Sequence, residues 1–121
     1  MSARILLIED QEDNRRIVRD LLRSVGYEII EAVSGEEGVA LAASQRPDLI
    51  LMDIQLPRID GYEATRRIRA NPELRETPIV AVTSYALSGD DEKAYEAGCT
   101  AYVAKPFDPM DLLTKVREYV S

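Results

Sequence analysis

Acidic side chains come directly after two apolar segments of the sequence. Glu9 and Asp10 follow residues 5–8, and Asp53 follows residues 49–52. Short apolar runs bounded by turn residues are typical of buried strands. A carboxylate at the end of a buried strand costs free energy unless a cation or hydrogen-bond donors compensate it. The sequence therefore predicts a compensated acidic site.

A hydroxyl and an ammonium end two further strand-like segments. Residues 78–83 end in Thr83, and residues 101–104 are followed by Lys105. In open α/β sheets the carboxyl ends of parallel strands line the crevice in which ligands bind. We therefore expect the three carboxylates, Thr83 and Lys105 to share one crevice. The alternative is that the acids are helix caps or exposed loop ends. It would be favoured for any one of these acids alone, but it does not explain why polar groups end four separate strands.

These side chains suit phosphoryl chemistry that depends on a divalent cation. Three adjacent carboxylates raise one another's pKa, and a bound cation relieves the repulsion. The chain has no histidine and one cysteine, so oxygen ligands point to Mg²⁺ rather than zinc. Lys105 can pair with one phosphoryl oxygen, and Thr83 can donate to another. An ionised Asp53 is then a nucleophile able to form an acyl phosphate.

Apolar periodicity predicts the elements that carry these residues. Strands are expected at residues 5–8, 27–32, 49–53, 78–83 and 101–104. Helical spacing follows each of them at residues 17–25, 34–43, 60–70, about 89–97 and 108–120. Such alternation predicts a doubly wound α/β fold, a parallel sheet with helices on both faces. The length of 121 residues predicts one domain, residues 1–121.

Composition narrows the class of partner. The formal net charge is −7, which disfavours nucleic acid. No apolar run approaches the ~18 residues of a membrane span, and the first residues do not form a signal peptide, so we expect a soluble cytoplasmic protein. Cys99 is expected to be a small buried residue. Four arginines of the first helix form either a solvated face or a docking surface: Arg15, Arg16, Arg19 and Arg23.

Four motifs give the chain a resemblance to a known family. They are Glu9-Asp10, MDIQLP around Asp53, AVTS with Thr83, and AYVAKP with Tyr102 and Lys105. In order and spacing, over essentially the whole length, the chain resembles the CheY-like receiver domain of two-component response regulators. The sequences of these motifs are most similar to those of the single-domain regulators of the DivK type. The resemblance implies a flavodoxin-like sheet of order 2-1-3-4-5 with five helices.

The same resemblance implies roles for individual residues. Asp53 would accept a phosphoryl group from a histidine kinase or a histidine phosphotransfer protein. Asp10, Asp53 and the backbone carbonyl of Gln55 would bind Mg²⁺, with Glu9 binding directly or through water. Lys105 would contact the phosphoryl group, and the Lys105–Pro106 bond would be cis.

Signalling would follow from two further residues that the resemblance identifies. Thr83 would be the switch hydroxyl, and Tyr102 the switch aromatic that turns inward and remodels the surface of the fourth helix, fifth strand and fifth helix. A downstream protein effector would read that surface, so the chain would be a signalling protein and not an enzyme acting on a separate substrate. Gln55 and Tyr85 would tune the lifetime of the phosphorylated form; Tyr85 either hinders an attacking water or only covers its loop.

Other readings of the same residues lead to different proteins. A phosphatase of the haloacid-dehalogenase type also uses an aspartate after a strand, but it needs a second acid where this chain has Gln55. A phosphorylation-independent module of the same fold is a second alternative, although the acidic set is intact. The chain could also be a receiver fragment of a hybrid histidine kinase or of a longer regulator. The start at Met1-Ser2 favours a standalone protein.

Overall fold

The computed structural model describes residues 2–83 and 90–120. Its five strands are all parallel and form one sheet with the order β2-β1-β3-β4-β5. The strands are β1 (Arg4–Ile8), β2 (Glu28–Ala32), β3 (Leu49–Asp53), β4 (Ile79–Thr83) and β5 (Ala101–Ala104). The expected doubly wound α/β fold and its strand order are therefore confirmed. β2 is the least buried of the five, as its place at the edge of the sheet requires.

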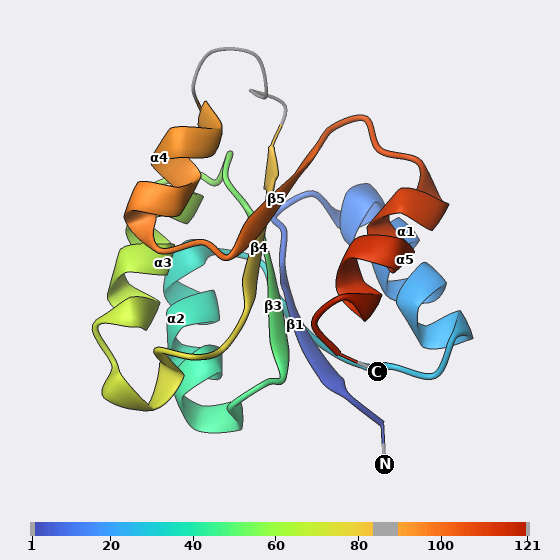
Figure 1. The fold of residues 1–121 in the computed structure, drawn as a ribbon, viewed down its shortest axis with the longest axis horizontal. Helices are drawn as coiled ribbons and strands as arrows, with labels where there is room; N and C mark the ends of the chain where they lie inside the picture. Colours follow the sequence, from blue (N-terminus) through green and yellow to red (C-terminus); the bar gives the residue numbers. More distant parts are fainter. Residues whose placement is uncertain (1, 84–89, 121) are drawn as a thin grey trace.

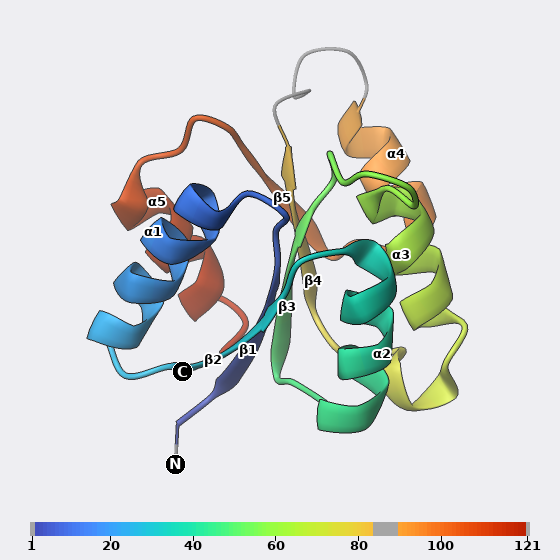
Figure 2. The ribbon, with the colours of Figure 1, turned by 180° about the vertical axis from the view of Figure 1, so that it is seen from behind.

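Helices cover both faces of this sheet, as Figure 1 and the opposite view in Figure 2 show. α1 and α5 lie on one face, and α2, α3 and α4 lie on the other. The helices are α1 (Glu12–Ser24), α2 (Gly35–Gln45), α3 (Gly61–Arg69), α4 (Asp90–Ala97) and α5 (Pro109–Arg117). The expected helices are thus present, with ends that differ by a few residues.

Side-chain caps set the starts of three helices. Ser34 accepts a hydrogen bond from the Glu37 amide, Asp60 caps α3 and Asp108 caps α5 in the same manner. The Glu37 carboxylate accepts from the Val33 amide at 2.8 Å, one residue before the cap, so the predicted capping box is displaced by one position.

The predicted break at Asn71-Pro72 contains a short element that the sequence pattern missed. Pro72–Leu74 forms a 3₁₀ turn, capped by the Asn71 side chain. Arg69 supports this turn by donating from Nη1 to the carbonyl of Leu74 at 2.7 Å. The half-buried Arg69 guanidinium donates to several carbonyls at once and so fixes the route from α3 into β4.

Two hydrophobic clusters, one on each face of the sheet, hold the fold together. On the α1/α5 face, Leu7 and Leu51 pack with Val18, Leu112 and Val116. The other face buries a second cluster that includes Leu6, Ile8, Ile50, Met52, Ile68 and Ile79. Because successive strand residues point to opposite faces, β1 and β3 contribute to both clusters. Burial on both faces explains their continuous apolar sequences.

Among the described residues, no helix is both long enough and apolar enough to cross a membrane. Cys99 is buried, as expected.

Candidate functional site

Three carboxylates meet where β1 and β3 end. Asp53 is the last residue of β3, and Glu9 and Asp10 directly follow β1. One oxygen from each of the three side chains lies within 4.8 Å of the others. Asp53 is only 4% exposed and Glu9 only 5%, whereas Asp10 is half-buried. The structure therefore brings together the acids that the sequence places at two separate strand ends.

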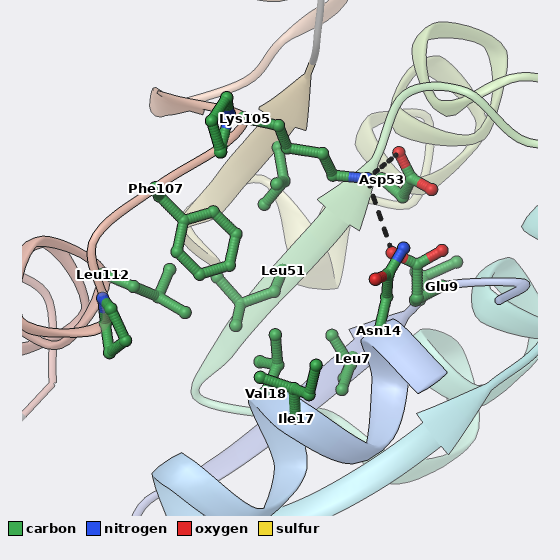
Figure 3. A pocket seen from close by; sticks show the side chains of 14 residues that line it. Leu7, Glu9, Asn14, Ile17, Val18, Leu51, Asp53, Lys105, Phe107 and Leu112 are labelled. Atoms are coloured by element: carbon green, nitrogen blue, oxygen red, sulfur yellow. Dashed lines mark hydrogen bonds and ion pairs between the residues drawn. The ribbon is translucent and has the colours of Figure 1, made fainter. Parts of the chain in front are cut away.

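One ammonium group bridges two of these carboxylates. Lys105 Nζ lies 3.3 Å from Asp53 Oδ1 and 3.5 Å from Glu9 Oε1 (Figure 3). The lysine directly follows β5, and its bond to Pro106 is cis. A cation at this distance from a buried carboxylate stabilises the charged form, so Lys105 supplies part of the compensation that Asp53 requires.

Backbone amides supply further compensation. The Gln55 amide donates to Asp53 Oδ1 at 3.1 Å, and the Gln11 amide donates to Glu9 Oε2 at 3.1 Å. Both donors come from the loops that follow the strands, two residues after their acceptors. The loop that follows each strand therefore fixes the position of the carboxylate at its end.

The site holds more negative charge than one ammonium can neutralise. Burial, and after it hydrogen bonding and charge repulsion from the neighbouring Asp53 carboxylate, together raise the pKa of Glu9 from 4.5 to about 7. The Gln11 amide and the Lys105 ammonium act in the opposite direction. A pKa this high in a carboxylate cluster indicates a site that favours an added cation.

The oxygen-only donor set fits Mg²⁺. Hard divalent cations prefer carboxylate and carbonyl oxygens, and Mg²⁺ keeps positions for water and phosphate oxygens. Glu9, Asp10 and Asp53 offer three carboxylate oxygens within 4.8 Å of one another. The residues present therefore suit the ion that the sequence predicts.

Arg15, which the sequence pattern did not assign to the site, supports it from α1. Its Nη1 donates to the backbone carbonyl of Glu9 at 3.0 Å, and its Nε pairs with Glu31 Oε1 at 3.1 Å. Arg19 pairs with the same Glu31 carboxylate. Within the stripe that reads as a solvated face or a docking surface, Arg15 therefore ties the end of β1 to β2, and Arg19 joins α1 to β2.

The remaining predicted residues occupy different positions around this centre. Thr83 is buried at the end of β4, one residue beyond the partner of Asp53 in the sheet register. Tyr102 lies in β5 and is half-buried, and Gln55 is exposed. Tyr85 lies outside the described residues, so its proposed effect on lifetime stays a prediction.

The two faces of the sheet divide these groups. Glu9, Asp53 and Lys105 each lie two residues beyond a member of the α1/α5 cluster (Leu7, Leu51 and Val103). Strand alternation directs Asp53 to that face, and Glu9 and Lys105, which directly follow β1 and β5, line a pocket with residues of the same cluster. Thr83 follows Ala81 of the opposite cluster by two residues, and Tyr102 packs against that cluster. The acidic site and the predicted switch aromatic thus lie on opposite faces.

A cavity of about 560 Å³ opens beside the acidic site on the α1/α5 face. Figure 3 shows Glu9, Asp53 and Lys105 at one end, with Phe107 and Ile17 farther along its wall. Asn14 of α1 also lines it. The sequence did not reveal this cavity, because it depends on how α1 packs beside the loop between β5 and α5.

A close backbone approach positions the end of β3. A Cβ atom on Gly61 would lie 2.5 Å from the Asp53 carbonyl oxygen and 2.7 Å from the Ile54 Cα atom. Only glycine fits this first residue of α3, because backbone atoms cannot turn aside as a side chain can. The Gly61 amide also donates to the Ile54 carbonyl at 3.0 Å.

Gly61→Ala is therefore expected to lower the free energy of unfolding by ~1–3 kcal/mol, the usual range for overpacking, and to displace Asp53. Urea denaturation measures the loss of stability. The displacement of Asp53, the nucleophile predicted from the sequence, is measured by the rate at which acetyl phosphate adds a phosphoryl group to the protein, called labelling below. Gly38→Ala is the matched control, because its Cβ would meet the end of the Ile8 side chain. Equal losses of stability and labelling in both variants would contradict the positioning role of Gly61.

Comparison with known proteins gives a consistent result. A family model described as "Response regulator receiver domain" matches residues 5–117. The polar-differentiation response regulator DivK of Brucella ovis is 41% identical over 120 residues, which cover 99% of this chain and 98% of that protein.

Two solved structures illustrate the structural likeness. The chemotaxis response regulator CheY4 of Vibrio cholerae has a TM-score of 0.94 at 28% identity, covering 99% of this chain and 100% of that one. The receiver domain of the sensor histidine kinase PA1611 from Pseudomonas aeruginosa has a TM-score of 0.92 at 42% identity, covering 98% of both chains. That structure contains a magnesium ion coordinated in the active-site cleft.

Proposed function

The chain belongs to the response regulator receiver family, and from this membership we propose that residues 1–121 act as one receiver domain whose Asp53 is the phosphoacceptor. The observation that carries the proposal is the position of Lys105 Nζ, 3.3 Å from the buried Asp53 carboxylate and beside two further acids. A structural ion pair alone does not require that extra negative charge. A site that holds a divalent cation for phosphoryl transfer uses such carboxylates as ligands.

The proposed reaction is a phosphoryl transfer from a phosphohistidine. An Asp53 carboxylate oxygen forms a bond to phosphorus while the bond from phosphorus to the donor imidazole nitrogen breaks, and the imidazole then takes up a proton. Lys105, 3.3 Å from Asp53, would pair with a phosphoryl oxygen as charge moves onto that oxygen. When bound by Glu9, Asp10, Asp53 and the Gln55 carbonyl, Mg²⁺ would neutralise charge on the acids and on the phosphoryl oxygens.

The donor is proposed to be a histidine kinase or a histidine phosphotransfer protein, acting in the cytoplasm. The cavity beside Asp53 supports an approach along the α1/α5 face. Its wall includes the side chain of Ile17, which is 61% exposed, and a protein partner that covers it would gain from burying it. The chain would carry only its own phosphorylation and dephosphorylation chemistry.

The proposed output is a change in the surface formed by α4, β5 and α5. The phosphoryl group adds acceptor oxygens at the end of β3, and Thr83, at the end of the adjacent strand, would donate to one of them. Tyr102, on the same face of the sheet as Thr83, would then turn inward. A downstream protein effector would recognise the altered surface.

The relatives include two arrangements of such a domain. DivK of Brucella ovis is matched over nearly its full length, whereas the Pseudomonas aeruginosa relative is the receiver domain of a sensor histidine kinase. We propose a DivK-like, standalone role, and the length of the gene that encodes this chain tests it directly.

Incubation with acetyl phosphate and Mg²⁺ tests the phosphoacceptor proposal. Intact-mass spectrometry should show the gain of one phosphoryl group, and adding a chelator before the donor should prevent it. A protein that gains no phosphoryl group over a range of Mg²⁺ concentrations would overturn the proposal.

Mg²⁺ affinity should depend on pH through Glu9. Because the pKa of Glu9 is raised to about 7, its carboxyl group must lose a proton before it can bind the cation below that pH. The apparent affinity is therefore expected to fall by up to about tenfold per unit as the pH decreases below 7, and to level off above 8. Isothermal titration calorimetry at several pH values measures the profile.

Glu9→Gln is the matched control for this profile. The amide has no titratable proton, so the variant should bind Mg²⁺ more weakly at high pH and with little pH dependence near 7. An unchanged slope in the variant would show that another group titrates there.

A further inference from the structure

An aromatic pair joins α4 to β5 on the face opposite the acidic site. The rings of Tyr95 and Tyr102 are 6.1 Å apart between centroids, with an interplanar angle of 75°. This edge-to-face geometry is one of the two preferred arrangements of aromatic rings. Tyr102 is half-buried, whereas Tyr95 on α4 is 50% exposed. Burial alone therefore does not account for the position of the Tyr95 ring.

The sheet register relates this pair to the end of β4. Tyr102 pairs with Ala81, and Thr83 pairs with Ala104, so Tyr102 and Thr83 lie on the same face two positions apart along adjacent strands. The Thr83 carbonyl accepts a hydrogen bond from the Lys105 amide at 2.7 Å. A displacement of Thr83 thus occurs next to the ring that Tyr95 contacts.

We propose that Tyr95 is a positioning residue for Tyr102: its ring holds the Tyr102 ring between α4 and β5 and so opposes the movement that phosphorylation of Asp53 sets in motion. This inference rests on the proposed function, in which Tyr102 is the switch aromatic. It adds Tyr95 to the switch and predicts that Tyr95 favours the unphosphorylated position of the Tyr102 ring.

The direction follows from what the contact stabilises. Tyr102 cannot turn away from its described position without losing the edge-to-face contact with Tyr95. Aromatic pairs of this geometry change equilibria by about two- to tenfold. Any group that binds Asp53 and favours the turned position must work against that contact, and removal of the contact must strengthen its binding by the same factor.

Beryllium trifluoride, which mimics a phosphoryl group on a carboxylate, provides the measurement. The full chain is titrated with BeF₃⁻ in saturating Mg²⁺ while the amide NMR signals of Asp53 and Lys105 report occupancy. We expect half-saturation at a concentration about two- to tenfold lower in Tyr95→Ala than in the unsubstituted chain. Tyr95→Phe keeps the ring and should behave like the unsubstituted chain. Because Tyr95 is half exposed, neither substitution removes a buried core side chain.

A double-mutant cycle separates coupling from a general loosening of α4. In a Tyr102→Ala background, Tyr95→Ala should leave the midpoint of the BeF₃⁻ titration unchanged. An equal shift in both backgrounds, or no shift in Tyr95→Ala alone, would overturn the inference while leaving Asp53 as the phosphoacceptor. If BeF₃⁻ produces no change at Asp53 in the unsubstituted chain, the proposed function fails, and the inference fails with it.

Discussion

Replacing Asp53 by asparagine will abolish the gain of a phosphoryl group from acetyl phosphate. The amide nitrogen has no nucleophilic lone pair to replace the carboxylate oxygen, and no other carboxylate of the site is both at the end of β3 and 3.3 Å from Lys105 among the residues that the structure describes. Intact-mass spectrometry after a fixed incubation measures the effect, which should be a loss of all detectable label.

The same substitution should change the neighbouring acid in a measurable way. Asp53 raises the pKa of Glu9 by hydrogen bonding and charge repulsion, so Asp53→Asn is expected to lower the Glu9 pKa toward its ordinary value. Carboxyl carbon NMR titration follows it. This result would show that the variant is folded around an altered site, so that its lack of labelling has a chemical cause.

Asp13→Asn is the matched control for both measurements. Asp13 loses the same charge, but its side chain is 88% exposed, and its ion pair is with Arg16 on the surface of α1. Labelling and the Glu9 titration should both be unchanged in this variant. Full labelling of Asp53→Asn would refute the assignment of the phosphoacceptor.

Lys105→Met is expected to separate metal binding from phosphoryl transfer by moving them in opposite directions. Removing a positive charge close to Asp53 and Glu9 should strengthen Mg²⁺ binding on the order of tenfold. At a separation of about 4 Å, and even at the dielectric constant of water, one positive charge repels a divalent cation by ~2 kcal/mol. The rate of labelling should nevertheless fall about 10²-fold, since the charge that stabilises the transferring group is lost.

The two effects require separate measurements at a pH well above the Glu9 pKa, because Lys105 also lowers that pKa. Calorimetry gives the Mg²⁺ affinity, and labelling at saturating Mg²⁺ gives the rate. Lys115→Met removes the same charge from an exposed pair with Glu118 on α5, and it should change neither quantity. A parallel loss of affinity and rate in Lys105→Met would instead indicate a collapsed site.

The acidic centre was predictable because it depends on strand ends. Glu9, Asp53 and Lys105 are far apart in the chain, but each follows a short apolar run. The carboxyl ends of parallel strands share one edge, so identifying the strands is enough to bring these residues together. The strand order itself came from the resemblance, since alternation of strands and helices does not distinguish among doubly wound orders.

Features that depend on helix packing were not predictable in this way. Arg15 belongs to a stripe that reads as solvated or as a docking surface, yet it donates to the Glu9 carbonyl. Its partner Glu31 lies in an edge strand, and nothing in the local sequence pairs the two. The cavity beside Phe107 and the contact between Tyr95 and Tyr102 likewise depend on how α1 and α4 pack on the sheet.

The acidic site and the predicted switch aromatic lie on opposite faces of the sheet, and this has a consequence for how the partners of such a protein can change. The cavity along which the donor is proposed to approach and the Tyr95–Tyr102 pair share no residue and lie on opposite sides of β5. Substitutions in the cavity wall can therefore redirect which donor is accepted without touching the ring contact. Input and output can then diverge independently in evolution or in design, with only the end of the sheet between them held constant.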